Sequence, residues 1–353
     1  TGASAVQAIP RIAEEAEHLT VFQRTANWVL PARNAATDPE FEAWVKANYD
    51  TIRARCLASG GAVPFDPPER AALSVSAEEQ QAVYQQLWDL GGMRFFSAFT
   101  DLFTDETANA TAQAFVRDHI ARTVHDPETA RKLTPNDHPI GVKRPPLDDD
   151  YYATFNRPNV TLADIRTHPI RAVDGATVRT TDGDHELDDL IVATGFDAIT
   201  GALLAMDIRG RGGVRLADRW TEGPSTYLGL GVAGFPNLFT VTGPLSPSVL
   251  ANMPTAVEQH VDWIAGCLDQ MRRHGIATVE ATETAELAWT AGSEAAVAGT
   301  LYPKAQSWYF GANIPGKPRR FGVYVGGFSA YREQCLQVAE RGYEGFRLNV
   351  AGN

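Results

Sequence analysis

The chain has 353 residues, which at roughly 150 residues per domain predicts two domains with sizeable cores. Hydrophobic residues make up 44% of it, which excludes wholesale disorder. The longest run without polar side chains, residues 227–236, is shorter than the about 18 residues of a membrane-spanning helix. The formal net charge of −12 argues against nucleic acid or an anionic membrane as the main partner, so any phosphate site must be built locally.

Cysteine and histidine usage indicates neither disulfides nor a metal site. Cys56, Cys267 and Cys335 are widely spaced and odd in number, which fits a reducing cytoplasm. The eight histidines show no HExxH motif or ligand-spaced pair, so we expect no metal site. The first twenty residues carry acids and no apolar core region, and we expect no signal peptide.

The first 135 residues are expected to be mainly helical. Ser4–Ala16 has helical spacing, with Pro10 expected to kink the helix or open one bond, and Leu19–Gln23 is predicted to be a buried strand. From about 35 to 135 the pattern is helical, with N-caps expected at Asp38, Ser76 and Asp126. The aromatic residues of this part are interpreted as helix-packing core rather than as a pocket wall: Trp44, Tyr49, Tyr84, Trp88, Phe95, Phe96, Phe99, Phe103 and Phe115.

The pattern then changes to strands alternating with helices, which indicates the α/β class. Asp174-Gly175 and Asp182-Gly183 are typical of hairpin turns, and a helix expected from about Met253 to Arg273 should end at Gly275. Strands are predicted at Val160–Ile165, Leu190–Thr194 and Leu238–Val241. The strand at 190–194 is expected to be buried.

The first residues are similar to part of a dinucleotide-binding fingerprint. Thr1-Gly2-Ala3-Ser4-Ala5 fits G-x-G-x-x-G/A without its first glycine and preceding strand. Gly2 would let the backbone approach a pyrophosphate, and the following helix N-terminus would hold the phosphates.

Two cationic positions favour a phosphate-bearing cofactor. Arg24 follows the predicted strand about twenty residues after the fingerprint, where an arginine accommodates the 2′-phosphate of NADP and an acid would bind the ribose of NAD; Thr25 could add a hydroxyl contact. Lys143-Arg144 precedes two prolines in a stiff, exposed loop. The alternatives are a solvated arginine at a strand end and an ordinary surface charge pair.

Taken together, the motifs resemble those of the Baeyer–Villiger monooxygenases, the class that includes cyclohexanone and phenylacetone monooxygenases. The resemblance covers essentially the whole chain and rests on Phe22–Trp28, Lys143-Arg144, Tyr151–Arg157, Ala193–Asp197, Tyr227–Leu230, Ala233–Phe239, Gly243–Ser248, Asn252-Met253, Glu258–Val261 and Ser307–Asn313.

The chain departs from the family pattern at its beginning. Neither the FAD fingerprint nor the family signature F-x-G-x-x-x-H-x-x-x-W occurs in it. The resemblance therefore implies a two-dinucleotide-binding-domain, Rossmann-like α/β flavoprotein without its N-terminal FAD-binding portion. Residues 1–196 would form the NADP-binding domain, with a helical insertion at about 35–135, and residues 197–353 the C-terminal part of the FAD-binding domain. We expect such a fragment to be poorly folded and inactive alone.

The resemblance implies an NADPH- and FAD-dependent enzyme that inserts one oxygen atom of O2 beside a ketone carbonyl, through a flavin C4a-peroxide, to give an ester or lactone. Arg144 matches the catalytic arginine, and no obligate protein partner is evident. Trp308, which could instead be a core tryptophan, matches a residue near the nicotinamide nucleotide. The cofactor-binding residues expected are Asn252 and Met253 for FAD, and for NADP Gly2, Ala3, Ser4, Ala5, Gln7, Arg24, Thr25, Lys143, Arg144 and Trp308.

Two alternatives stay open at this point. One is a related flavin monooxygenase that oxidises nitrogen or sulfur; the Lys143-Arg144 pair argues for ketone chemistry, because heteroatom oxidation needs the neutral hydroperoxide. The other is a non-catalytic NADP-binding remnant.

Overall fold

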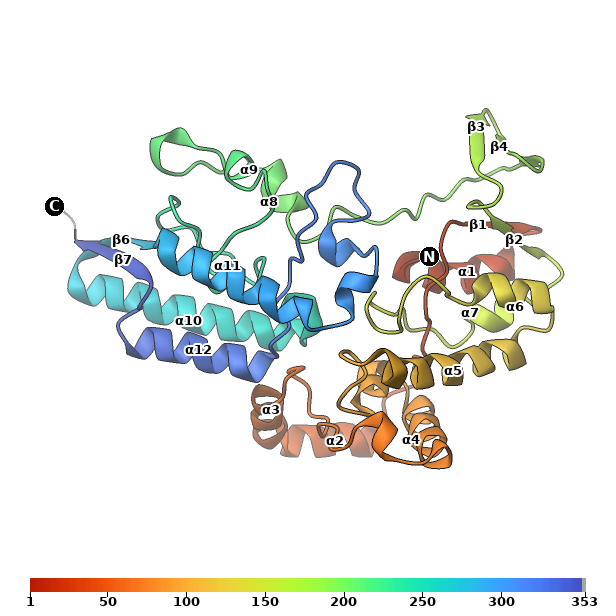
Figure 1. Ribbon diagram of the computed structural model, residues 1–353, viewed down its shortest axis with the longest axis horizontal. Coiled ribbons are helices and arrows are strands. Elements are labelled where there is room, and N and C mark those ends of the chain that lie inside the picture. Colours follow the sequence, from red (N-terminus) through yellow and green to blue (C-terminus); the bar gives the residue numbers. More distant parts are fainter. Residues whose placement is uncertain (351–353) are drawn as a thin grey trace. The chain divides into compact units, whose positions relative to one another are not determined.

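The computed structural model describes residues 1–350 and divides into two compact units (Figure 1). Unit 1 comprises Thr1–Ala35 and Pro68–Gly195, and unit 2 comprises Ala36–Pro67 and Phe196–Asn353. Gly195, the last residue of unit 1, has a φ of 94°, a conformation that side chains with a Cβ adopt only at a cost.

Unit 1 combines a parallel strand pair with helices and a small antiparallel sheet. Its helices are α1 (Ala3–Glu15), α4 (Ala77–Leu90), α5 (Glu106–Thr123), α6 (Pro127–Leu133) and α7 (Tyr151–Thr154), and its strands are β1 (Leu19–Gln23), β2 (Val160–Asp164), β3 (Ile170–Asp174), β4 (Thr177–Thr180) and β5 (Asp184–Glu186). Strands β1 and β2 are parallel, with Gln23 opposite Asp164. Their carboxyl ends therefore lie at the same edge.

Local signals in the sequence placed the helix starts correctly. The side chains of Asp38, Ser76 and Asp126 accept hydrogen bonds from backbone N–H groups of the first turns of α2 (Pro39–Ala47), α4 and α6. Helix α1 continues through Pro10. The predicted hairpin turns and the strands β1 and β2 are also confirmed.

Most of the predicted aromatic core is confirmed. Tyr84, Phe95, Phe99 and Phe115 are at most 3% exposed. The ring centroids of Phe95, Phe99 and Phe115 lie 5.3–5.5 Å from that of Tyr84. The prediction is wrong for Trp44 and Tyr49, which are 53% and 57% exposed. They lie on α2 and on α3 (Tyr49–Ala58), neither of which has a buried residue.

Unit 2 is organised around a long helix. Helix α10 (Met253–His274) ends at Gly275 with a left-handed C-cap, as predicted, and packs on α12 (Phe328–Glu340) and β6 (Ile276–Ala281) (Figure 1). The remaining elements are α2, α3, α8 (Gly201–Ala205), α9 (Leu216–Arg219), α11 (Glu283–Ala298) and β7 (Phe346–Val350), which pairs with β6.

Two predicted strands are absent from the structure. Leu190–Thr194 forms no strand, and Leu190, Ile191 and Val192 are 50%, 64% and 71% exposed. Leu238–Val241 also forms no strand; Thr240 N–H instead donates to the Leu230 carbonyl. A strand requires a partner for its backbone groups, and no segment among residues 1–350 pairs with either run. An apolar run indicates β propensity but carries no information about its partner.

Candidate functional site

A polar pocket of about 430 Å³ lies in unit 1 at the carboxyl ends of β1 and β2. Arg24 and Thr25 directly follow β1, and Arg166 follows β2 by two residues. The C-terminal end of α6 adds Arg131 and Lys132. The parallel pairing of the strands thus brings cations that are distant in sequence to one edge of the sheet.

These cations differ in whether a carboxylate already holds them. Arg131 pairs with Glu128 at 2.6 Å, and Lys132 lies 3.7 Å from the same side chain. Within the described part of the chain, no ion pair or side-chain hydrogen bond involves Arg24. Its guanidinium is therefore available to an anionic ligand.

The N-terminus of α1 lies beside Arg24. The Thr1 backbone nitrogen donates a hydrogen bond to the Thr25 carbonyl at 2.6 Å, which holds the start of α1 against the residue after Arg24. Gly2 is the N-cap, no side chain caps the helix, and the first helical bond runs from Val6 N–H to the Gly2 carbonyl. The N–H groups of the first turn, at positions 3–5, have no helical acceptor and point out of the helix start, the arrangement that suits an anion.

A group of charged residues adjoins the pocket. The Lys143 side chain is 16% exposed, and its Nζ lies 3.8 Å from Asp137 Oδ2; the Arg166 guanidinium lies 3.9 Å from the same oxygen. His138 Nδ1 lies 2.6 Å from Asp137 Oδ1. The hydrogen bond from His138, together with the charge of Lys143, lowers the pKa of Asp137 to about 2. Burial lowers the pKa of Lys143.

The sequence reasoning missed Asp137, His138 and Arg166. Arg166 directly follows the predicted strand Val160–Ile165, so the rule that carboxyl ends of parallel strands meet could have placed it beside Arg24. Nothing in the sequence pattern relates Asp137 to Lys143.

Arg144 lies on a loop whose backbone is held by burial and hydrogen bonds. Its side chain is exposed, while Pro145 and Pro146 are buried. The backbone carbonyl of Arg144 accepts from the Asn27 amide at 3.3 Å, and the Pro146 carbonyl accepts from Leu30 N–H. Gln7, another predicted cofactor contact, donates its side-chain amide to the Leu147 carbonyl at 3.1 Å.

In unit 2, the loop of residues 242–248 holds a strained backbone. Thr242, Leu245 and Ser248 have φ values of 49°, 65° and 42°, conformations that cost non-glycine residues about 1–3 kcal/mol each. The Pro244 and Leu245 carbonyls accept from side chains of Thr226 and Trp289, and Ser246 accepts from Tyr324 N–H. Such strain persists only where surroundings enforce it, which indicates a functional segment.

A buried histidine fixes the start of this loop, here called the 242–248 loop. His260 is 0% exposed; its Nδ1 accepts from Thr242 N–H at 2.9 Å, and its Nε2 lies 2.7 Å from the Tyr331 hydroxyl. That hydroxyl donates to the Leu228 carbonyl at 2.6 Å, so Nε2 carries the proton. Burial lowers the pKa of His260 to about 4.

The predicted FAD contacts follow the 242–248 loop. Asn252 is the N-cap of α10, with its side-chain oxygen accepting from Thr255 N–H, and Met253 is the first helical residue. Both side chains are exposed. The helix N-terminus favours negative charge near them.

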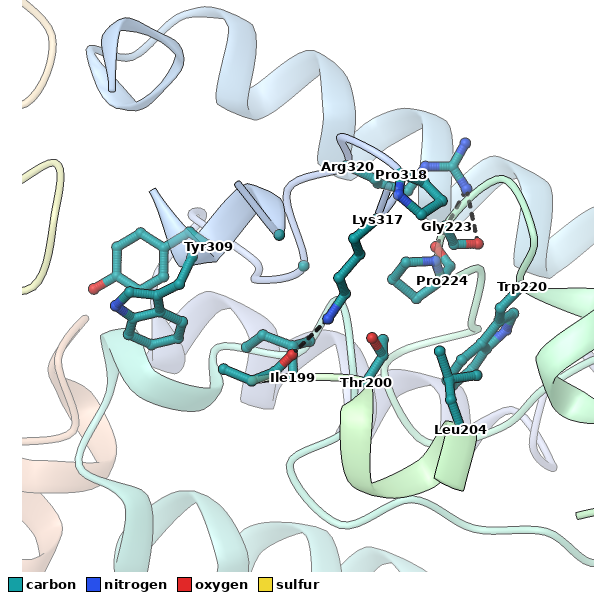
Figure 2. A pocket seen from close by; sticks show the side chains of 14 residues that line it. Ile199, Thr200, Leu204, Trp220, Gly223, Pro224, Tyr309, Lys317, Pro318 and Arg320 are labelled. Atoms are coloured by element: carbon teal, nitrogen blue, oxygen red, sulfur yellow. Dashed lines mark hydrogen bonds between the residues drawn. The ribbon is translucent and has the colours of Figure 1, made fainter. Parts of the chain in front are cut away.

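A second pocket, of about 390 Å³, lies within unit 2 (Figure 2). Trp308 is half-buried at its wall, so it is not a fully buried core tryptophan. Lys317 crosses the pocket to the Ala198 carbonyl at 2.9 Å and pairs with Asp197. Arg320 donates to the Gly223 and Pro224 carbonyls.

Residues 1–350 contain no group of three or more His, Cys, Asp or Glu side chains placed to hold a metal ion. None of their helices has the length and apolar character needed to cross a membrane.

Comparison with known proteins decides the family. No protein-family profile matches the chain. It is 42% identical to cyclohexanone 1,2-monooxygenase of Acinetobacter sp over 353 residues, which cover 99% of this chain and 64% of that protein. It is also 42% identical to a Baeyer–Villiger monooxygenase of Pseudooceanicola batsensis, over 97% of this chain and 63% of that protein. The chain belongs to the Baeyer–Villiger monooxygenase family.

Two further similar proteins extend the comparison. The phenazine N-monooxygenase PhzNO1 of Lysobacter antibioticus is 42% identical, over 99% of this chain and 64% of that protein. The crystal structure of the OTEMO complex with FAD and NADP superimposes with a TM-score of 0.95 at 40% identity, over 99% of this chain and 65% of that chain. The chain therefore has the mixed α/β, two-dinucleotide-binding-domain fold of these flavoproteins. It spans somewhat less than two thirds of the length of these relatives.

Proposed function

We propose that this protein is an NADPH- and FAD-dependent Baeyer–Villiger monooxygenase that inserts one atom of O2 beside a ketone carbonyl. The observation that carries the proposal is the unpaired Arg24 beside the free N–H groups of α1, in a chain 42% identical to cyclohexanone 1,2-monooxygenase.

Unit 1 fits NADP(H). The N–H groups of Ala3, Ser4 and Ala5 would hold the pyrophosphate, which Gly2 can approach because it lacks a Cβ. Arg24 and Lys143 would bind the 2′-phosphate, and Thr25 would add a hydroxyl contact. Residues 1–196, most of which form unit 1, are thus proposed as the NADP-binding domain, with a helical insertion at about 35–135. By the family resemblance, Trp308 is proposed as a contact of the nicotinamide nucleotide.

Unit 2 fits part of an FAD site. The FAD, when bound, would supply the activation of O2. The 242–248 loop would present its rigid backbone to the flavin ring, and Asn252 and Met253 would place the positive end of α10 near it. The side-chain amide nitrogen of Asn252 makes no hydrogen bond within residues 1–350 and is free to donate. Residues 197–353 are accordingly proposed as the C-terminal part of the FAD-binding domain.

Arg144 is proposed as the catalytic arginine. A guanidinium stays protonated at neutral pH, so it stabilises negative charge at the oxygen-transfer site without releasing a proton to it. The buried Pro145 and Pro146 and the bond from Asn27 fix its backbone, while its side chain is exposed.

A second candidate is oxidation of a heterocyclic nitrogen. It is favoured by the 42% identity to phenazine N-monooxygenase PhzNO1, which equals that to the ketone monooxygenases. The Lys143-Arg144 pair supports the ketone reaction, because a fixed cation favours an anionic oxidant. The three unpaired cysteines support a reducing compartment such as the cytoplasm, and we propose no protein partner.

The test uses the protein expressed from its complete gene and loaded with FAD. NADPH consumption, product mass and 18O incorporation from O2 are measured with cyclohexanone, with a thioether and with phenazine. Ester or lactone carrying one 18O atom is expected from the ketone. Oxidation of phenazine or the thioether without ketone oxygenation would establish the second candidate. If none of the three compounds is oxygenated, the result would favour the alternative of a non-catalytic NADP-binding remnant.

A further inference from the structure

Asp137 is the most unexpected charge in the proposed phosphate pocket. It lines the pocket together with Arg24 and Arg166, where its negative charge by itself would repel a phosphate. A carboxylate in an anion site requires an explanation from its contacts.

One face of Asp137 is fixed by a buried histidine. Oδ1 lies 2.6 Å from His138 Nδ1, and the His138 side chain is fully buried. His138 Nε2 has no hydrogen-bonding partner within residues 1–350, so the ring proton resides on Nδ1 and is donated to Asp137. The His138 carbonyl accepts from Trp28 Nε1 at 3.3 Å, which anchors the pair to the core.

The other face of Asp137 meets two cations. Oδ2 lies 3.8 Å from Lys143 Nζ and 3.9 Å from the Arg166 guanidinium. The Lys143 side chain is only 16% exposed, whereas that of Arg166 is 56% exposed. The carboxylate therefore acts mainly on Lys143, which has little solvent to stabilise its charge.

We propose that Asp137 is a positioning residue of the phosphate pocket, which holds the Lys143 ammonium, and secondarily the Arg166 guanidinium, in place for the 2′-phosphate of NADPH. The inference rests on the proposed function of unit 1. It assigns part of the preference for NADPH over NADH to a carboxylate that acts through the Lys143 ammonium.

The pH dependence of binding gives this role a specific signature. Lys143 faces Asp137, Arg24 and Arg166 and, through Asp137, His138. Asp137 is the only anion among these groups, and it raises the pKa of Lys143 against burial and the neighbouring cations. Without Asp137, Lys143 should lose its proton at a lower pH than in the unaltered protein, and phosphate binding should begin to weaken at that lower pH.

The experiment measures binding of 2′,5′-ADP and 5′-AMP by calorimetry to the protein expressed from its complete gene. Asp137→Asn should weaken 2′,5′-ADP binding about tenfold, the effect typical of removing a group that orients a binding side chain, and leave 5′-AMP binding unchanged. The alkaline decline of 2′,5′-ADP binding should move to lower pH. Asp137→Glu, which keeps the charge, should recover most of the affinity and also serves if Asp137→Asn does not fold.

Asp164→Asn is the matched control. Asp164 lines the same pocket, but its oxygens bond to Arg166 N–H and the Thr167 hydroxyl, and no cationic side chain pairs with it within the described residues. Removing its charge should leave 2′,5′-ADP binding equal or tighter. Equal or tighter binding by Asp137→Asn would overturn the positioning role, because the carboxylate would then only repel the phosphate.

The same data separate this inference from the proposed function. If the unaltered chain binds 2′,5′-ADP no better than 5′-AMP, the proposed NADP site is wrong. If it prefers 2′,5′-ADP and Asp137→Asn keeps that preference at every pH, only the role of Asp137 is wrong. The ratio of KM for NADPH to KM for NADH in the flavin-loaded protein gives a second reading, expected to rise in Asp137→Asn at similar kcat.

Discussion

The phosphate pocket of unit 1 and the 242–248 loop of unit 2 are built by opposite means. The pocket gathers charged side chains at the ends of two parallel strands, over backbone in ordinary conformations. The loop has few charges, and its distinctive feature is backbone at positive φ held by buried hydrogen bonds. A site for a phosphate needs charge, whereas a site for a planar ring needs a fixed surface.

The comparison predicts different responses to substitution. In the phosphate pocket and in the loop that carries Arg144, single side chains should control ligand binding or reaction rate, with little effect on stability. Around the 242–248 loop, substitutions should change the stability of unit 2 first. Four predictions test this contrast.

The largest effect is expected at Arg144. Arg144→Ala should lower the rate of ketone oxygenation by the complete, flavin-loaded protein about 10²- to 10³-fold, the usual effect of removing one preorganised group that stabilises developing charge. The measurement is ester or lactone formed per unit time at saturating NADPH. Arg157→Ala removes an exposed arginine of unit 1 whose side chain bonds to Asn159 and should leave the rate unchanged; an equal loss there would indicate a general charge effect.

The next effect is a loss of stability in acid through His260. Its pKa falls from 6.5 to about 4 on folding, so between these values the unfolded chain binds a proton that the folded chain does not. Stability should therefore decline as pH falls from about 6.5 towards 4 and level off below, by about 3 kcal/mol in total.

Urea unfolding followed by tryptophan fluorescence at a series of pH values measures this loss. His260→Gln should unfold more easily at pH 7 and show a flatter profile between pH 6.5 and 4. Tyr331→Phe keeps the histidine and should retain the pH dependence. An unchanged profile in His260→Gln would assign the acid sensitivity to other groups.

A smaller effect is expected from Arg24. Arg24→Ala should weaken 2′,5′-ADP binding about 10- to 100-fold, because a hydrogen bond to a charged group contributes about 1.5–3 kcal/mol, and should not change 5′-AMP binding. Arg131→Ala is the matched variant, since Arg131 lines the same pocket but is already paired with Glu128. Calorimetry should find at most a slight change for it, and equal losses would mean that the pocket acts through total charge alone.

The smallest effect is expected from relieving strain in the loop. Thr242→Gly should stabilise unit 2 by up to about 1 kcal/mol or leave it unchanged, because glycine adopts a φ near 49° without a steric cost. Thr221→Gly removes a threonine whose hydroxyl also bonds to a backbone carbonyl and whose φ is not positive, and it should destabilise. Equal destabilisation in urea unfolding would show that the loop is not strained.

Helix starts, hairpin turns and the end of α10 could be predicted because each depends on a few neighbouring residues. Asp38, Ser76, Asp126 and Gly275 are examples. The two missing strands could not be predicted, because a strand depends on a partner distant in sequence.

The sequence by itself determined the family, through motifs such as Phe22–Trp28 and Lys143-Arg144, and the residue types that an NADP phosphate needs. Only the tertiary structure decided which cations are free and which are held. Arg24 makes no ion pair within the described residues, whereas Arg131 pairs with Glu128 and Lys143 pairs with Asp137. The physical reason is that motifs record chemistry residue by residue, whereas the charge balance of a pocket depends on distances that only the folded chain fixes.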